Sequence, residues 1–272
     1  MSTLRTSLIS LLLLSGCART VTPERAARDR LEIADELPAW RTHGEEVRLA
    51  IANDFLSVHN TSGALDIIRQ MRAEGYDGPR LDLAQGRALR LDGVMSEAER
   101  LLIMAQKRLP KDGSPSAELC ILYADLHDVG KAIEACRKAT RIDDRDGASW
   151  NNLGYLLLSQ GDAEGALEAA EHAVKVDALT DRYRNNLAMA QAALGRKDMA
   201  YRTLSSTLDK ADAAYMVGLA VERFESLDAA RPWYERALEQ NPNHPEAQAA
   251  LAPVEPTGNA APLPSPVPEK TP

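Results

Sequence analysis

The sequence has few aromatic residues: two Phe, three Trp and seven Tyr, which together are 4% of 272 residues. Aromatic rings supply much of the contact area in many cores, so this core must be built from aliphatic side chains and alanine. Hydrophobic residues nevertheless make up 44% of the chain, which is long enough for one or two domains with a substantial core. This composition favours closely packed helices over a sandwich of aromatic-bearing strands.

The sequence also lacks an apolar run of the roughly 20 residues that a membrane-spanning helix needs. The segment from Leu8 to Leu14 is seven residues long. It follows a basic residue, Arg5, and precedes the small residues Ser15 and Gly16. A charged start, a short apolar middle and small residues at the cut are the pattern of an export signal, so we predict a signal peptide over residues 1–16.

The four residues Leu14-Ser15-Gly16-Cys17 resemble the lipobox of bacterial lipoproteins. This resemblance implies cleavage before Cys17 and acylation of Cys17, with the mature protein anchored to a membrane by lipid. Ala18 stands where an aspartate would imply retention at the inner membrane, so the resemblance favours the periplasmic face of the bacterial outer membrane. The alternative is an ordinary signal peptide in which Cys17 is incidental.

Positive charge is in deficit, with 32 Lys and Arg against 40 Asp and Glu and a formal net charge of −8. A chain of this balance is a poor candidate for binding nucleic acid or for electrostatic adhesion to anionic lipid. We therefore expect protein partners, no nucleic acid, and membrane contact through the lipid alone.

Residues arranged for catalysis are also missing. The five histidines form neither HExxH nor any other metal-ligand spacing, and no glycine-rich phosphate loop or nucleophile elbow is present. His59 and His127 occur at the same repeat position, where we interpret them as turn residues that replace glycine. The sequence therefore predicts a protein that is not an enzyme and has no cofactor or metal.

Three cysteines are present, and Cys120 and Cys136 remain after lipidation of Cys17. In an exported protein an even pair is a candidate disulfide. The alternative is that both are buried small apolar residues. The sequence does not decide between these two interpretations.

The sequence does contain an internal repeat of 34 residues. Asn151-Asn152-Leu153 recurs as Asn185-Asn186-Leu187, and Gly161 recurs as Gly195. Earlier and later segments follow the same spacing of small and apolar residues. Each repeat contains two helical patterns separated by a turn, and one such pair cannot bury both of its faces, so the pairs must stack.

This period and its signature resemble the tetratricopeptide repeat, and the best match is the segment with Trp150, Leu153, Gly154, Gly161 and Ala166. The resemblance implies an all-α fold, a right-handed α-solenoid of about six helix-turn-helix units. We place these units at 45–78, 79–112, 113–146, 147–180, 181–210 and 211–244.

The fifth unit is four residues short, about one helical turn, so its second helix should lose a turn while the array continues. Pro232 should remove one hydrogen bond from the second helix of the sixth unit. Residues 17–44 should form a short linker and a helix, and Thr42 with Glu45 should form a capping box. We expect a capping helix at 245–252 and a disordered or polyproline-like tail at 253–272, which holds seven prolines.

The family resemblance implies that a peptide partner binds in the concave face lined by the first helix of each unit. Asparagine amides there could hold a backbone, and Tyr, Met and Arg suit binding surfaces. The alternative is that some of these residues pack inward. The candidate groove residues are Arg80, Arg87, Arg90, Ile121, Asn151, Asn152, Tyr155, Leu158, Asn185, Asn186, Met189, Tyr215 and Leu219.

Two functions fit these features. An outer-membrane lipoprotein of such repeats resembles the pilotins of type IV pilus secretins and the repeat lipoprotein of Tad pilus systems, which implies an adaptor for pilus or secretion assembly. The alternative is a scaffold for cell-wall or outer-membrane-protein machinery that recruits a periplasmic enzyme. The sequence does not separate them.

Overall fold

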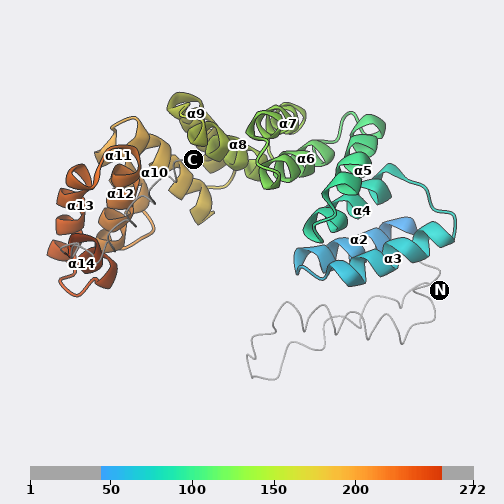
Figure 1. Ribbon diagram of the computed structural model, residues 1–272, viewed down its shortest axis with the longest axis horizontal. Helices are drawn as coiled ribbons and strands as arrows, with labels where there is room; N and C mark the ends of the chain where they lie inside the picture. The colour runs from blue at the N-terminus through green and yellow to red at the C-terminus, as the bar shows by residue number, and fades with distance from the viewer. Residues whose placement is uncertain (1–43, 253–272) are drawn as a thin grey trace, which may run out of the picture. The chain divides into compact units, whose positions relative to one another are not determined.

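The computed structural model describes residues 44–252, and all regular structure in that range is helical (Figure 1). This confirms the all-α prediction. The signal peptide, Cys17, the predicted helix before residue 44 and the tail 253–272 lie outside the described residues. The described helices are α2 Glu45–Ser57, α3 Thr61–Ala73, α4 Pro79–Leu91, α5 Met95–Arg108, α6 Ser114–Asp125, α7 Val129–Ile142, α8 Gly147–Ser159, α9 Ala163–Val176, α10 Asp181–Ala193, α11 Lys197–Leu204, α12 Lys210–Phe224, α13 Leu227–Gln240 and α14 Pro245–Leu251.

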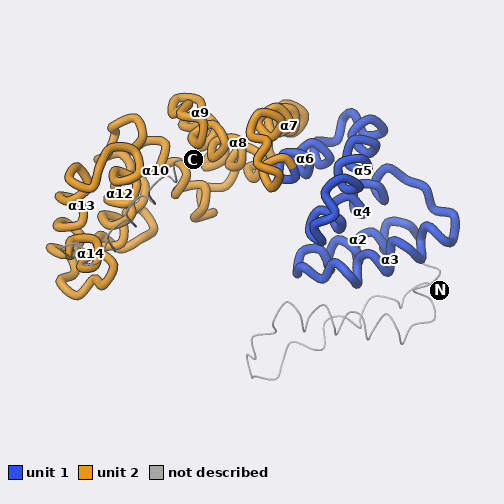
Figure 2. Tube along the Cα trace, in the orientation of Figure 1, with its two compact units in different colours: residues 1–122 blue, residues 123–272 orange. Residues whose placement is uncertain are grey.

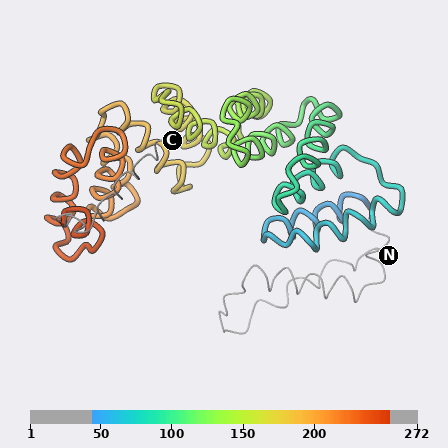
Figure 3. Tube along the Cα trace, in the orientation of Figure 1, coloured from blue at the N-terminus to red at the C-terminus, as the bar shows by residue number. Residues whose placement is uncertain are grey.

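The chain divides into two compact units, residues 1–122 and 123–272, and the division falls within α6 (Figure 2). In the first unit α2 packs on α3 and α4, and α4 packs on α3 and α5. Their core includes Leu56, Ile68, Met71 and Leu81. Within each unit successive helices follow one another in chain order, as expected for a repeat protein (Figure 3).

In the second unit α8 packs on α9, and α10 packs on both of them as well as on α11 and α12. α12 in turn packs on α13, and α14 closes the described part against α13. The core of the last helices is made of alanines with Val217, Val221 and Tyr234. The aliphatic, alanine-rich core expected from the composition is therefore present.

Small residues in the first helices permit close helix packing. A Cβ atom added to Gly218 would lie 2.4 Å from Cε1 of Tyr234, and one added to Gly154 would lie 3.2 Å from the carbonyl oxygen of Ala166. Gly154 belongs to α8 and Ala166 to α9, so the close approach is between the two helices of one pair. A larger side chain at these positions would force the helices apart.

Turns between paired helices use the left-handed backbone region. Gly93, Gly161 and Gly195 have positive φ, and so do His59, at 59°, and His127, at 58°. Successive positions in this set of five are 34 residues apart. The interpretation of both histidines as turn residues in glycine positions is confirmed.

The residue after the turn often caps the next helix. Asn60, Asp128 and Asp162 accept hydrogen bonds from backbone amides three residues later, at 3.0, 3.1 and 2.9 Å. The bonds from the backbone and side chain of Lys131 lower the pKa of Asp128. By contrast α2 follows Gly44 without a side-chain cap, and Thr42 of the expected capping box lies outside the described residues.

Two irregular helices follow the expectations. α11 has 8 residues against 14 in α9, and α12 still packs on α10 and α11. Pro232 lies inside α13, where its missing N–H removes one backbone hydrogen bond. No helix among residues 44–252 is long and apolar enough to cross a membrane.

Cys120 and Cys136 are almost fully buried, at 1% and 0% exposed. Both are disulfide-bonded in the structure. The structure therefore agrees with the disulfide interpretation and not with that of two buried free cysteines.

Candidate functional site

An exposed apolar surface in the second unit lies on α8, α10 and α12. α10 contacts both α8 and α12, so these helices form one continuous surface. Tyr155 is 53% exposed and Leu219 is 40% exposed, and both stand at the ninth position of their predicted units. We call this surface the first-helix face and define it by Asn152, Tyr155, Asn185, Asn186, Met189, Met216 and Leu219.

The residues that define the first-helix face are all uncharged. Their side chains are amides, thioethers, one phenol and one aliphatic group. Charged groups lie beyond the ends of the row, as with Arg182 near the start of α10 and Arg223 near the end of α12. A partner segment on this face would therefore meet hydrogen-bonding groups and apolar groups, without an ion-pair requirement.

An asparagine pair joins two helices of the face. Nδ2 of Asn186 in α10 donates a hydrogen bond of 2.8 Å to Oδ1 of Asn151 in α8. Asn151 is only 6% exposed, so it is not an open groove residue as expected. Instead it fixes the amide of Asn186, which keeps one N–H and its carbonyl oxygen for other bonds.

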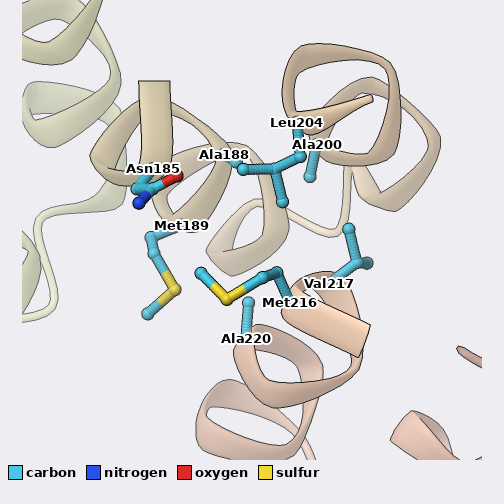
Figure 4. Close-up of a pocket in the computed structure, with 8 residues that line it drawn as sticks. All are labelled: Asn185, Ala188, Met189, Ala200, Leu204, Met216, Val217 and Ala220. Atoms are coloured by element: carbon cyan, nitrogen blue, oxygen red, sulfur yellow. The ribbon is translucent and has the colours of Figure 1, made fainter. Parts of the chain in front are cut away.

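A small pocket opens between α10 and α12 (Figure 4). The side chains of Met189 and Met216 point toward the same space, and Asn185 lies at its edge. The space among its lining atoms is about 190 Å³ when open solvent is counted, so the pocket is a shallow depression and not an enclosed small-molecule site. It can contact the end of one apolar side chain, and the flexible methionines can move to admit more of it. The remaining lining residues are Ala188, Ala200, Leu204, Val217 and Ala220.

The short helix α11 accounts for the position of this pocket. Leu204, which lines the pocket, is also the last residue of α11. In α9 and α13 the next turn carries the fully buried Ala173 and Ala237. The equivalent residue after α11 is Thr207, which lies outside any helix. The missing turn thus removes packing atoms next to the pocket.

Met216 was missed among the predicted groove residues, although a usable signal existed. It stands at the sixth position of its unit, the same position as Asn152 and Asn186. Applying that position to the sixth unit would have found it.

Two arginines of the predicted cluster in the first unit are tied to one carboxylate. Arg87 Nε lies 3.2 Å from Oε1 of Glu118, and Arg90 Nε lies 3.3 Å from Oε2 of the same residue. The side chain of Arg90 is 10% exposed. Only Arg80 of the three is fully exposed. Glu118 of α6, which sequence reasoning left out, pairs with both arginines and offsets part of the positive charge of the cluster.

Other groove candidates are partly or largely packed. Leu158 is 9% exposed, which fits the alternative of inward packing, and Ile121 is half-buried. Tyr215 packs its ring 5.7 Å from Tyr234 and 5.1 Å from His244. Burial raises the pKa of Tyr215. Tyr215 therefore serves packing more than recognition.

Buried polar side chains recur at the fourth position of the predicted units and were not anticipated. Arg48, Asp82, Ser116 and Arg184 all lie below 9% exposure, at 34-residue spacing with Trp150 between them. Each is hydrogen-bonded to a side chain on or just after a neighbouring second helix. Arg48 bonds to Glu74, and Asp82 bonds to Arg72 and Arg108. Ser116 bonds to Gln106, and Arg184 bonds to Thr207. These bonds satisfy groups that would otherwise be costly to bury.

His244 holds the last helix in place. Its Nε2 lies 3.1 Å from Oδ1 of Asp212, and its Nδ1 accepts a bond of 3.2 Å from the amide of Ala247. The ring thus caps α14 and ties it to α12. Among residues 44–252 no group of three or more His, Cys, Asp or Glu side chains could hold a metal ion.

Comparison with known families identifies the repeats. The tetratricopeptide repeat model matches residues 119–177, 151–204 and 200–245. A relative in Arabidopsis thaliana, Protein CTR9 homolog, is 29% identical over 121 residues, which are 42% of this chain and 11% of that protein. Residues 119–245 thus match the tetratricopeptide repeat model, and the chain spans about a tenth of the length of this relative.

Solved structures share the fold. YrrB, described as a tetratricopeptide repeat protein with an unusual peptide-binding site, is 19% identical with a TM-score of 0.55 over 67% of this chain and 96% of its own. The pilF protein of Pseudomonas aeruginosa is 13% identical with a TM-score of 0.57 over 75% and 95%. The C-terminal part of a repeat protein from Cytophaga hutchinsonii is 13% identical, with a TM-score of 0.60 over 84% of this chain and 95% of its own. At these identities the likeness concerns the fold alone.

Proposed function

We propose that this protein is a non-enzymatic scaffold, anchored to the outer membrane through Cys17, that captures a segment of a protein partner on its first-helix face. The observation that carries the proposal is the exposure of Tyr155 and Leu219 beside the Met189–Met216 pocket. Exposed apolar groups gathered on one surface are typical of binding sites. Tetratricopeptide repeats mediate protein–protein contacts, which agrees with this role.

The chemistry of the face indicates the kind of segment it takes. One apolar side chain of the partner enters the Met189–Met216 pocket, where flexible thioethers adapt to its shape. Asn152, Asn185 and Asn186 bond to the partner's backbone, which amides can do as donors and as acceptors. Since the face is uncharged, the bound part of the partner is uncharged as well.

The biological setting rests on the sequence. The lipobox-like segment and the resemblance to pilus lipoproteins favour a role in assembling or localising a pilus or secretion complex. The pilF likeness agrees with this setting, though it concerns fold alone. A lipid anchor would keep the scaffold at the membrane where a secretin or pilus subunit assembles. A role in cell-wall or outer-membrane-protein machinery is the competing outcome of the test.

Photo-crosslinking in intact cells tests the proposal. A photoreactive amino acid in place of Tyr155 should capture one partner, and the same residue at Glu168, which is exposed on α9, should not. A captured secretin or pilus component supports the proposal in full. Capture of a cell-wall enzyme would support the alternative role in cell-wall or outer-membrane-protein machinery. Equal capture from both positions would show that the first-helix face is not the partner site.

A matched pair of substitutions sharpens the result. Met216→Lys places a charge in the pocket and should reduce capture about thirtyfold, as removal of a 2 kcal/mol hot spot does. Met199→Lys makes the same change at an exposed residue of α11, where Met199 is 41% exposed, and should leave capture unchanged.

A further inference from the structure

The helix α14 lies against the last pair of helices, α12 and α13. It packs on both α12 and α13, since Ala247 shares a buried cluster with Ala214 and Ala237. His244 at its start is tied to Asp212 of α12. Counting one 34-residue period from 211 makes Pro245 the first residue of a further repeat.

The described chain ends close to the first-helix face. α14 ends at Leu251, and Ala252 after it has left the helical conformation. Leu251 packs against the same buried cluster as Met189 and Met216 of the face. The segment that follows Ala252 therefore starts near these two methionines.

The composition of the segment 257–268 matches the face. Its sequence is Thr-Gly-Asn-Ala-Ala-Pro-Leu-Pro-Ser-Pro-Val-Pro, without a charged residue. Its four prolines lack N–H groups, so this backbone offers more carbonyl acceptors than N–H donors. Asn152, Asn185 and Asn186 supply side-chain N–H donors. Leu263 and Val267 each stand between two prolines, and Leu263 is the larger apolar side chain to place against the flexible Met189 and Met216.

The length of the segment also suffices. Leu263 is 12 residues beyond Leu251, which is about 37 Å in an extended polyproline conformation at ~3.1 Å per residue. The pocket lies between α10 and α12, and neighbouring packed helices are ~8–10 Å apart, so the path from α14 is about 20 Å. Because the segment is tethered, its effective concentration at the face is in the millimolar range for a short flexible link.

We propose that residues 257–268 dock on the first-helix face of the same molecule, with Leu263 in the Met189–Met216 pocket, and that a partner must displace them. This inference rests on the proposed function of the face. The segment acts as a tethered competitor: it covers the apolar groups until a partner that binds better arrives. If the segment occupies the face nine-tenths of the time, it weakens partner binding about tenfold.

Methyl NMR of the full chain labelled with ¹³C at its methionine methyl groups tests the docking. Leu263→Asp should shift the Met189 and Met216 methyl resonances, because the charged side chain leaves the pocket. Thr271→Asp adds the same charge outside the docking segment and should leave both resonances in place. A synthetic peptide of residues 253–272 added to the Leu263→Asp chain should restore the original positions.

Unchanged methyl resonances in Leu263→Asp would overturn the proposal. Resonance positions that depend on protein concentration would also overturn it, because they would place the segment of a second copy in the pocket. Crosslinking from position 155 separates this inference from the proposed function. Capture that is equal in wild type and Leu263→Asp rejects only the tethered competitor, whereas methyl shifts without any capture reject only the partner role.

Discussion

His59 and His127 occupy backbone conformations that glycine adopts at the equivalent turns. Their φ values of 59° and 58° lie in the left-handed region, which costs an L residue about 1–2 kcal/mol. The histidines are tolerated because the turn length, and thus the packing of both helices, fixes the backbone there. At these two positions the protein is therefore less stable than it would be with glycine, the residue at the equivalent turns.

Replacing His127 by glycine should stabilise the protein. Relief of the left-handed strain exceeds the extra backbone entropy of glycine, ~0.5–1 kcal/mol, so a net gain of about 0.5–1 kcal/mol is expected. Urea unfolding followed by circular dichroism measures it. His172→Gly is the control, since His172 lies within α9 and stacks on Trp150 at 4.3 Å. That change should destabilise, and a loss of stability in His127→Gly would refute the strain argument.

The individual residues of the face show what sequence could and could not predict. The repeat register correctly placed Tyr155, Leu219 and the asparagines on the first helices, because a 34-residue period fixes which residues share a face. It did not reveal that Asn151 is buried under Asn186, or that Glu118 pairs with Arg87 and Arg90. Those states depend on contacts between repeats, and the period carries no information about the partner side chain.

At the scale of elements, α11 and the start of α10 compensate for each other. Arg184 is 7% exposed, and its guanidinium donates to Oγ1 of Thr207 and to the carbonyl oxygen of Leu179, and pairs with Asp181. The equivalent residue one repeat earlier is Trp150, which stacks on His172 of the full-length α9. Where the second helix is short, as in α11, the long side chain of Arg184 takes the place of the stacked Trp150 ring. Its hydrogen bond to Thr207 holds the loop that follows α11.

Arg184→Ala should therefore lower stability by about 2 kcal/mol, because packing and three bonded contacts are lost together. Part of the cost is spared since Asp181 is well exposed and is solvated again by water. Arg202→Ala, an exposed arginine in α11, should change stability by less than about 0.5 kcal/mol. Thermal unfolding of both variants compares them. Equal melting temperatures would show that the loop after α11 does not depend on Arg184.

The length of α11 could be predicted only in part. The missing four residues indicated a shorter second helix, and a continuous array follows because α12 still packs on α10 and α11. The pocket was not foreseen, since a void depends on which side chains fill the space. Leu204 and Met216 leave it open, and neither residue is unusual in its own helix.

At the scale of the whole molecule, the proposal joins two properties: an anchor before the repeats and a face within them. A soluble scaffold would search for its partner in three dimensions, whereas an anchored one is already at the membrane. One acyl chain gives only marginal membrane binding, so stable attachment requires the multiple chains that lipoprotein processing supplies. In this proposal the anchor places the first-helix face at the membrane, and the residues of the face select the partner.

Cys17→Ser separates these properties. Without the thiol no acyl chain can be attached, so the protein should appear in the soluble periplasmic fraction or remain unprocessed. Cell fractionation with immunodetection measures this, and Cys136→Ser is the matched control, which should remain with the membrane. Purified Cys17→Ser protein should still bind the partner found by crosslinking, because the first-helix face is unchanged. A processed Cys17→Ser protein that stays in the membrane fraction would refute the lipid anchor. Loss of binding by the soluble variant would instead show that the face needs the membrane.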